Sequence, residues 1–187
     1  RTLKEELKKN DRAPELALDV VEEVGAALAY LQERGVVHRD VKPENIFVRE
    51  NGGLVLMDLG IAQTANTESL TVAGQAMGSP LYMAPEQVQG KPGPATDQYA
   101  LGLVLYEILA GRRPFRATDV AALVHQHIHE PPPPPRQLEP RISEAVENAL
   151  LRMLAKRPEE RLATVGEARR AVAEGLAGLR WRRSPAD

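Results

Sequence analysis

The sequence H-R-D-V-K-P-E-N at residues 38–45 combines the residue types that a phosphoryl transfer needs. Asp40 supplies a carboxylate that can orient a hydroxyl group, Lys42 a cation for a phosphate, and Asn45 a neutral oxygen ligand for a hard metal ion. Each of these residues is also common in ordinary polar loops, where Asp and Asn stabilise turns. The informative feature is therefore their combination within six residues.

A second acidic residue with possible chemistry is Asp58. It follows the apolar run Leu54–Met57 and precedes Leu59-Gly60, so a strand would deliver its carboxylate beside a flexible glycine. An aspartate in this position can bind Mg²⁺, and it is equally common in turns. Only one predicted hairpin separates Asp58 from Asp40, which favours a shared site.

The elements that must position these residues are mostly helical. Apolar residues recur at spacings of three and four from about Pro14 to Arg34, and Gly35 suits a helix stop. Two short apolar runs, 46–48 and 54–56, flank an Asn-Gly-Gly turn that is typical of a β-hairpin. The sequence therefore predicts a mainly α protein with a small β-hairpin. Further helices are predicted at 96–110, 118–129, 143–154 and 164–179.

Three other features carry weaker signals. Residues 59–78 are polar and rich in small side chains, which predicts a long functional or mobile loop. Pro131–Pro135 predicts a polyproline spacer, either a plain connector or a ligand for a proline-binding module. His125, His127 and His129 alternate at a spacing of two, which spreads them around a helix and disfavours a metal site.

The composition narrows the function classes. The 187 residues are 43% hydrophobic and 27% charged, as in one ordinary globular domain. A net charge of −2 gives no basic field for nucleic acid, so we expect no nucleic-acid partner. The absence of cysteine excludes disulfides and fits a reducing compartment. The strongest apolar stretch, 99–111, is too short to span a bilayer.

A third motif, G-S-P-L-Y-M-A-P-E at residues 78–86, completes a pattern that resembles the protein kinase superfamily. H-R-D-V-K-P-E-N resembles the catalytic loop, D-L-G the magnesium motif usually written D-F-G, and A-P-E the end of the activation segment. The resemblance covers essentially the whole chain and matches the large C-terminal lobe, here residues 1–179. Residues 180–187 then form a basic tail or the start of a linker. The style of the motifs resembles bacterial members.

The resemblance implies a role for each residue at the reacting centre. Asp40 resembles the catalytic base, and Lys42 resembles the lysine that contacts the γ-phosphate in serine/threonine kinases. Asn45 and Asp58 resemble the two ligands of Mg²⁺ (or Mn²⁺). Phe47 matches the position of a side chain beneath adenine. Lys42, Asn45, Phe47 and Asp58 are therefore expected to bind ATP and its metal ion.

Other matched positions are expected to support this centre. Ser79 resembles the hydroxyl residue that helps to select a Ser or Thr acceptor. Asp97 resembles the buried helix aspartate that bonds the backbone of the catalytic loop, and Arg161 resembles the arginine that pairs with Glu86. His38 matches a packed residue of the regulatory spine. Asp97, Arg161, Glu86 and His38 are expected to stabilise the fold around the site rather than to take part in the chemistry.

Regulation by phosphorylation is also implied. In the family, an arginine before the catalytic aspartate often pairs with a phosphorylated residue of the activation loop, and Arg39 has that position. The candidates for phosphorylation are Thr71, which is best placed, and Ser69, Thr67 and Thr64. A phosphate there would bring negative charge to Arg39 and order the loop.

Two parts of a kinase do not occur in this sequence. It contains no G-x-G-x-x-G motif, and none of its six lysines lies in an apolar strand. We therefore expect a serine/threonine protein kinase whose ATP-binding lobe lies outside these residues, and no activity from these residues alone. Its partners would be ATP and protein substrates, in the cytoplasm or at the cytoplasmic face of a membrane. The alternative is a non-catalytic, kinase-like module that binds proteins.

Overall fold

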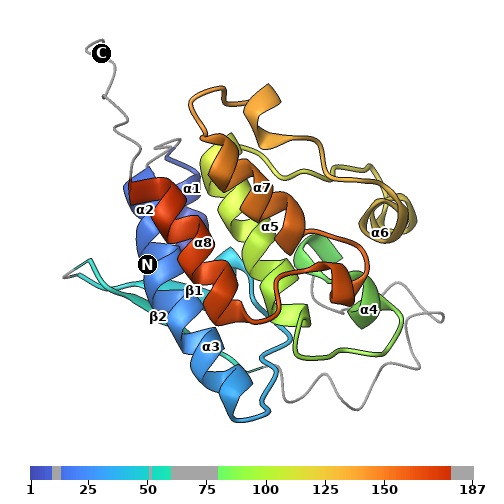
Figure 1. The fold of residues 1–187 in the computed structure, drawn as a ribbon, viewed down its shortest axis with the longest axis horizontal. Helices are drawn as coiled ribbons and strands as arrows, with labels where there is room; N and C mark the ends of the chain where they lie inside the picture. Colours follow the sequence, from blue (N-terminus) through green and yellow to red (C-terminus); the bar gives the residue numbers. More distant parts are fainter. Residues whose placement is uncertain (10–13, 51, 60–79, 178–187) are drawn as a thin grey trace.

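A buried helix, α5 (Thr96–Ala110), runs through the middle of the molecule (Figure 1). Every residue of α5 except Glu107 is buried, because other helices pack around it on several sides. The helix ends at Gly111, whose φ of 74° is the left-handed cap that glycine adopts without a Cβ penalty. The helix predicted for residues 96–110 is thus confirmed at both ends.

The computed structural model describes residues 1–9, 14–50, 52–59 and 80–177. Its other helices and strands are α1 (Leu3–Leu7), α2 (Pro14–Asp19), α3 (Gly25–Glu33), β1 (Ile46–Val48), β2 (Leu54–Leu56), α4 (Pro85–Val88), α6 (Val120–His129), α7 (Glu144–Met153) and α8 (Val165–Ala177). A π-helical segment, Val20–Val24, joins α2 to α3. Short 3-10 turns cover Pro43–Asn45, Pro80–Tyr82, Pro135–Gln137 and Pro158–Glu160.

The first long helix is the one predicted from Pro14 to Arg34, with one difference. Helices α2 and α3 are continuous through the π-helical segment Val20–Val24, which the sequence analysis did not predict. Val20, Val21 and Val24 are all buried there, so the apolar pattern looks the same in either helix type. The predicted stop is confirmed, since Gly35 follows with a φ of 71°.

The hairpin is the only sheet in the described part of the chain. Strands β1 and β2 pair antiparallel, with Ile46 opposite Leu56 and Phe47 opposite Val55. Gly52 in the turn has a φ of 89°, as the predicted Asn-Gly-Gly turn requires. The N-terminal segment lies beside β1, where Thr2 forms a bridge with Phe47.

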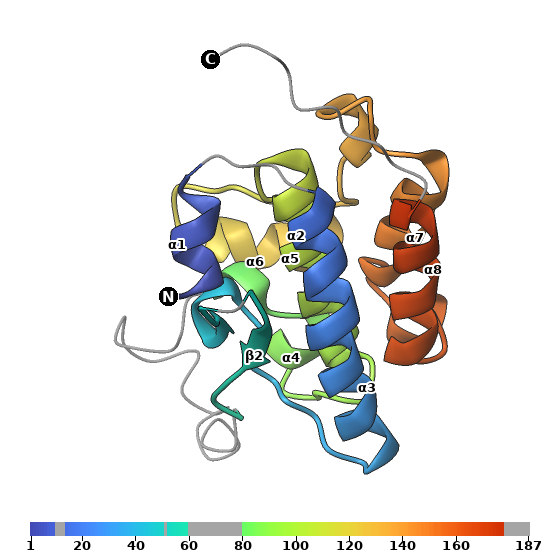
Figure 2. The same ribbon diagram turned by 90° about the vertical axis from the view of Figure 1, so that its left-hand side faces the viewer.

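Helices α7 and α8 pack against each other and against the α3–α5 core (Figure 2). Ser143 caps α7 by accepting a hydrogen bond of 3.3 Å from the amide of Val146. Thr164 caps α8 by accepting a hydrogen bond of 3.0 Å from the amide of Glu167. The predicted fold class, mainly α with a small hairpin, is confirmed.

Two smaller predictions concern connectors and tails. The proline segment packs on the lobe, because Tyr106 of α5 donates a hydrogen bond of 2.9 Å to the carbonyl of Pro133, and this favours a connector. The predicted tail 180–187 lies outside the described residues. Within the described ranges, no helix combines the length and apolar character that crossing a membrane requires.

Candidate active site

The 38–45 loop, between α3 and β1, brings three of the predicted site residues together. Lys42 Nζ lies 2.9 and 2.7 Å from the two carboxylate oxygens of Asp40. Asn45 Nδ2 donates to Asp40 twice, to the side-chain Oδ2 at 2.8 Å and to the backbone oxygen at 2.9 Å. The side chains of Asp40 and Lys42 are about one-fifth exposed. The Asp40 carboxylate is therefore held by two donors and remains partly exposed.

Asp97, near the start of α5, fixes the beginning of this loop. Its two carboxylate oxygens accept hydrogen bonds from the backbone amides of His38, at 2.7 Å, and Arg39, at 2.8 Å. Burial raises the pKa of Asp97, and the two amides oppose that rise by bonding the ionised form. Gln87 of α4 holds the same loop from the other side, through a bond of 2.7 Å to the carbonyl of Arg39.

His38 joins the loop to the end of the hairpin. It is buried, and its Nε2 lies 3.1 Å from the backbone oxygen of Met57. Burial lowers the pKa of His38, so the ring is neutral at physiological pH and donates to that oxygen. The next residue is Asp58, which has a left-handed φ of 57°. His38 therefore links the segment that carries Asp40 to the segment that carries Asp58.

The two predicted metal ligands come from the same end of the hairpin. The Met57 amide donates a hydrogen bond of 2.8 Å to the Asn45 backbone oxygen, which extends the β1–β2 ladder by one position. Asn45 uses Nδ2 for its bonds to Asp40, so its carbonyl Oδ1 is the atom suited to a metal. One amide oxygen and one carboxylate are hard ligands of the kind that Mg²⁺ prefers, so the chemistry of this donor pair suits that ion.

The described residues hold no larger cluster of metal-ligating side chains. Across the described residues, no group of three or more His, Cys, Asp and Glu side chains could hold a metal ion. The three α6 histidines do not form one either. His127 is buried in the core, while His125 and His129 are exposed and their ring centroids lie 4.7 Å apart.

Apolar side chains are exposed around this end of the hairpin. Phe47, predicted to lie beneath adenine, is 41% exposed on β1. A pocket of about 360 Å³ lies between α3 and the end of β2. Its lining includes Tyr30 and Leu31 of α3, His38, and the run Met57–Leu59. An apolar surface therefore adjoins the polar Asp40 centre.

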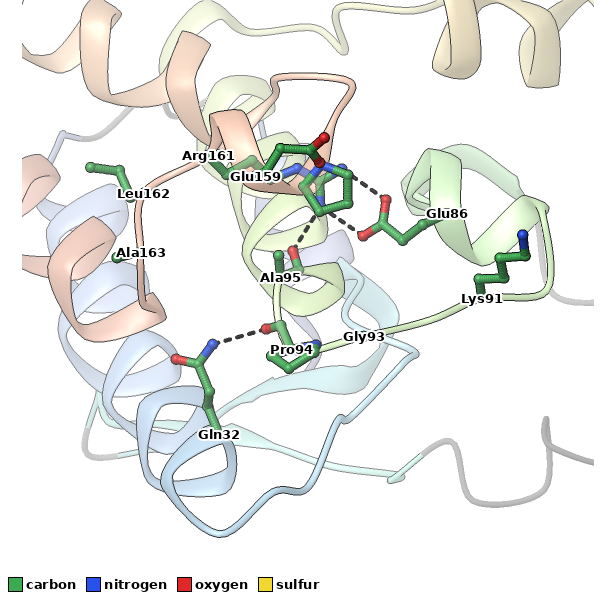
Figure 3. A pocket seen from close by; sticks show the side chains of 11 residues that line it. Gln32, Glu86, Lys91, Gly93, Pro94, Ala95, Glu159, Arg161, Leu162 and Ala163 are labelled. Atoms are coloured by element: carbon green, nitrogen blue, oxygen red, sulfur yellow. Dashed lines mark hydrogen bonds and ion pairs between the residues drawn. The ribbon is translucent and has the colours of Figure 1, made fainter.

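Glu86 and Arg161 form the ion pair that the resemblance predicts (Figure 3). The guanidinium makes two parallel bonds to the carboxylate, of 2.7 and 2.8 Å, and donates another to the carbonyl of Ala95. Thr96 adds a bond of 3.0 Å to Glu86. Both charged side chains are buried, so the pair ties α4 to the segment before α8. Figure 3 shows it beside a cavity of about 310 Å³.

Of the remaining predicted site residues, only Arg39 lies in the described part of the chain. Ser79 and the four phosphorylation candidates Thr64, Thr67, Ser69 and Thr71 are in the undescribed range 60–79. Arg39 is described, and its Nε atom is buried without a hydrogen-bond partner among the described residues. Its pairing with a phosphate therefore stays a prediction.

Sequence reasoning missed polar residues that hold together the segments around the site. Gln98 is fully buried in α5 and bonds both the amide and the carbonyl of Leu162. Tyr82 donates a hydrogen bond to Glu107, the one residue of α5 that is not buried. Gln98 could have been noticed, because a glutamine inside an apolar helix needs a buried partner. The Tyr82–Glu107 contact has no signal in the sequence.

Two kinds of comparison relate this chain to known proteins. The family described as "Protein kinase domain" matches residues 1–173. The chain is 44% identical over 167 residues to the serine/threonine-protein kinase Pkn1 of Myxococcus xanthus, covering 86% of this chain and 24% of Pkn1. It is 41% identical over 166 residues to the serine/threonine-protein kinase PknA of Mycobacterium tuberculosis, covering 88% of this chain and 38% of PknA. The chain thus spans about a quarter to two-fifths of the length of these relatives.

Proposed function

The chain belongs to the protein kinase domain family, and from this premise we propose that it forms the large lobe of a serine/threonine protein kinase. Such an enzyme transfers the γ-phosphate of ATP to Ser and Thr hydroxyl groups of protein substrates. The observation that carries the proposal is the Asp40 carboxylate, bonded by Lys42 and Asn45 on a loop that Asp97 fixes. The printed names of the relatives support the choice of Ser and Thr as acceptors.

Asp40 is the residue that orients the acceptor hydroxyl in this proposal. Its carboxylate sits at the surface of the loop, so an incoming hydroxyl can reach it. Lys42 lies against Asp40 at 2.7 Å and is in position to move its ammonium toward a phosphate oxygen when one arrives. Asp40 would then hold the acceptor hydroxyl and Lys42 the phosphate. This is the positioning that phosphoryl transfer needs.

Mg²⁺ (or Mn²⁺) would be held by Oδ1 of Asn45 and the carboxylate of Asp58. When bound, the ion neutralises charge on the β- and γ-phosphates. The protein's own part is to fix the two ligands. The β1–β2 ladder holds Asn45, and His38, through Met57, holds the residue before Asp58.

The nucleotide would lie over the hairpin, with its base on the exposed face of Phe47. The neighbouring apolar side chains Tyr30, Met57 and Leu59 are also exposed, each by more than 40%. A second lobe that covers this surface would close the site and bring the glycine-rich loop and strand lysine that the 187 residues do not contain. We assign residues 1–179 to the large lobe and 180–187 to a tail or linker.

Control of activity would act through the segment between Asp58 and Glu86. Ser79 would lie next to the acceptor and favour Ser or Thr. A phosphate on Thr71, or on a neighbouring hydroxyl, would bond the guanidinium of Arg39, whose buried Nε lacks a partner among the described residues. Because Arg39 directly precedes Asp40, ordering Arg39 would order the reacting carboxylate as well.

The test is Asp40→Asn in the full-length protein. We expect kcat for a protein substrate to fall by about 10²-fold or more, because the amide cannot accept the proton. Affinity for ATP should change by less than about twofold, since Asp40 does not contact the nucleotide. Glu50→Gln is the matched control, an exposed carboxylate-to-amide change outside the site. An unaltered kcat would contradict the role of Asp40, and a parent protein without any transfer activity would instead indicate a non-catalytic binding module.

A further inference from the structure

Two of the three histidines on α6 lie side by side on its outer face. His125 and His129 are both exposed, and their ring centroids lie 4.7 Å apart with the rings tilted by 47°. They are four residues apart, and in an α-helix such residues are neighbours on one face. His127 lies between them in sequence and is buried on the opposite face. The spacing of two separates His127 from the others, whereas the spacing of four brings His125 and His129 together.

The other histidines of the sequence are engaged inside the lobe. His127 is 1% exposed, and its Nδ1 lies 3.0 Å from the hydroxyl oxygen of Tyr99. His38 is 2% exposed, and its Nε2 is bonded to a backbone oxygen. The sequence has four histidines and no cysteine. His125 and His129 are therefore the only exposed side chains of these 187 residues with an imidazole or thiolate donor, the donors that suit Zn²⁺ and Cu²⁺.

The separation of the two exposed rings suits one metal ion between them. An imidazole nitrogen binds Zn²⁺ at about 2.1 Å, which places the ion about 3.2 Å from the ring centroid. Two centroids 4.7 Å apart then subtend an angle of about 95° at a shared ion. That angle is near the right angle of tetragonal Cu²⁺ and Ni²⁺ sites and within about 15° of the tetrahedral angle of Zn²⁺ sites. Because both rings are exposed, rotation of the side chains can bring one nitrogen of each onto the ion without moving the helix.

Helix α6 keeps the pair at this spacing because both of its ends are fixed. At the first turn, Asp119 accepts a hydrogen bond of 2.8 Å from the amide of Ala122. At the last turn, Lys156 Nζ donates to the carbonyls of Gln126 and His127, at 3.0 and 2.8 Å. A pair of ligands on a fixed backbone loses little freedom when an ion arrives, so the second imidazole binds at a high effective concentration. The helix therefore favours chelation over binding by one ring.

Lys156 is the cation that could oppose a metal ion at this end of α6. Its ammonium lies on the buried side of the helix, 4.1 Å from the centroid of the Phe115 ring, which the ring of His127 also contacts. It interacts electrostatically with Glu130, the exposed acidic residue that follows His129. The helix dipole places further partial negative charge at the same end. The charge of Lys156 is thus offset, and a cation can bind at the outer face.

We propose that His125 and His129 form a two-histidine site for a divalent transition metal ion of the Zn²⁺, Cu²⁺ and Ni²⁺ class. The ion takes one imidazole nitrogen from each residue and fills its other positions with water or an external ligand. Structural zinc sites have four protein ligands, so a site with two is an exchangeable one. It differs in chemistry from the Asn45 and Asp58 pair, whose oxygen donors suit Mg²⁺. The inference does not depend on the proposed kinase function.

Calorimetric titration of the full-length protein with ZnCl₂, CuCl₂ and NiCl₂ tests the site. His125→Asn and His129→Asn should each weaken binding by about tenfold or more, because a single imidazole cannot chelate. The measured quantity is the difference from the parent, so histidines elsewhere in the full-length protein cancel. Cu²⁺ should bind more tightly than Zn²⁺ or Ni²⁺, in the usual order for nitrogen ligands. Mg²⁺ prefers oxygen ligands and should give the same titration in the parent and the variants.

Two double variants separate the spacing of the histidines from their number. Ala121 is exposed one turn before His125. Ala121→His combined with His129→Asn recreates a spacing of four and should restore the affinity of the parent within about threefold. Ala121→His combined with His125→Asn leaves two exposed histidines eight residues apart, about 12 Å along the helix and too far for one ion. This second double variant should bind as weakly as the single ones.

Equal affinity of the parent and the single variants would overturn the proposal, as would equal affinity of the two double variants. A parent protein that binds none of the three ions more tightly than about 1 mM would overturn it as well. If a variant does not fold, the parent alone decides. Paramagnetic Cu²⁺ should broaden the nuclear magnetic resonance signals of the amides at residues 121–130 in ¹⁵N-labelled full-length protein, and signals there that stay sharp would exclude the site.

Discussion

Asp97 Oδ1 accepts a hydrogen bond of 2.8 Å from the backbone amide of Arg39, a residue held at a left-handed φ of 69°. A non-glycine residue in that region costs about 1–3 kcal/mol and persists only where its surroundings enforce it. Asp97 enforces it, because its other oxygen bonds the amide of His38 and so clamps two successive peptide groups. The strained residue directly precedes Asp40. The carboxylate of α5 therefore sets the direction in which the 38–45 loop presents Asp40.

Replacing Asp97 by Asn tests this clamp. An amide has one oxygen, so one of the two backbone N–H groups would face an NH₂ group and lose its partner. We expect a loss of about 1–3 kcal/mol in the free energy of unfolding, the cost of an unsatisfied buried donor. A misdirected Asp40 should also lower kcat by about tenfold or more, through positioning. Urea unfolding and steady-state kinetics measure the two effects.

The control for this substitution is Asp119→Asn. Asp119 caps α6 by accepting a bond of 2.8 Å from the Ala122 amide, and Asn is an equally good cap. The control should therefore keep the stability and kcat of the parent. If Asp97→Asn also kept both, the clamp would be irrelevant to Asp40.

The Glu86–Arg161 pair predicts a second, purely structural effect. Arg161→Met removes the cation and leaves the Glu86 carboxylate buried without a partner charge. Breaking a buried pair in this way costs about 3–5 kcal/mol. Arg161→Lys should rescue little, because one ammonium cannot replace the parallel bonds to Glu86 and the bonds to Ala95 and Ala155. Denaturant unfolding followed by circular dichroism measures the loss.

The matched comparison is the exposed pair Arg157–Glu159. Arg157→Met should leave the free energy of unfolding almost unchanged, because surface ion pairs contribute little. Equal losses at Arg157 and Arg161 would show that burial of the Glu86 pair does not govern its contribution.

Acid should weaken the fold through His127. Its pKa is about 3 in the folded protein and near the ordinary 6.5 in the unfolded chain, so between these values only the unfolded chain binds the proton. The contribution of His127 is therefore complete above pH 6.5 and is lost progressively as the pH falls toward 3. Between pH 7 and pH 5 the group should remove about 2 kcal/mol from the free energy of unfolding.

His127→Gln removes this titration and leaves the carboxylates unchanged. The decline of stability from pH 7 to pH 5 should be shallower in this variant than in the parent by that amount. His125→Asn, which removes an exposed histidine, should follow the parent. Parallel pH profiles for the parent and His127→Gln would mean that the buried ring accepts a proton without unfolding the chain.

The sequence predicted the elements better than it predicted their contacts. The helix at 96–110 was placed correctly because its apolar residues form a dense run, interrupted by Gly102 and Glu107, that ends at a glycine. The π-helical segment Val20–Val24 was missed, because one widened turn leaves the spacing of buried valines unchanged. Periodicity also says nothing about which helices meet, and the bond between Tyr99 and His127 depends on that packing.

The site residues show the same difference between what the sequence predicts and what depends on tertiary contacts. Asp40, Lys42 and Asn45 lie within six residues, so the chain itself brings them together. The contacts of Asp97 with the 38–45 loop and of Arg161 with Glu86 span 58 residues or more. They could be anticipated only through the resemblance to a family. Gln87 matches no motif residue, and Tyr82 lies in the 78–86 motif without an expected role there. The partners of both residues follow from the tertiary structure alone.

Residues 1–187 expressed alone should fold into a helical unit. Helix α5 is covered by helices of the same chain, and one core cluster includes residues from α1 to α8. A core that is complete within the chain favours cooperative unfolding. Circular dichroism and a single urea transition would test this. A molten, non-cooperative species would mean that the core needs the surface around Phe47 to be covered.

The same 187 residues should lack measurable kinase activity. The Asp40 loop and Asp58 can reach a nucleotide from one side only, so water would surround the γ-phosphate and Mg·ATP would bind in many orientations. Positioning accounts for about 7–11 kcal/mol of a bimolecular barrier, and losing half of it slows transfer by about a thousandfold or more. Calorimetry should therefore find at best millimolar affinity for Mg·ATP, and radiolabel transfer to a basic protein should not exceed the background. Micromolar binding, or turnover that Asp40→Asn abolishes, would show that this lobe catalyses transfer without a second one.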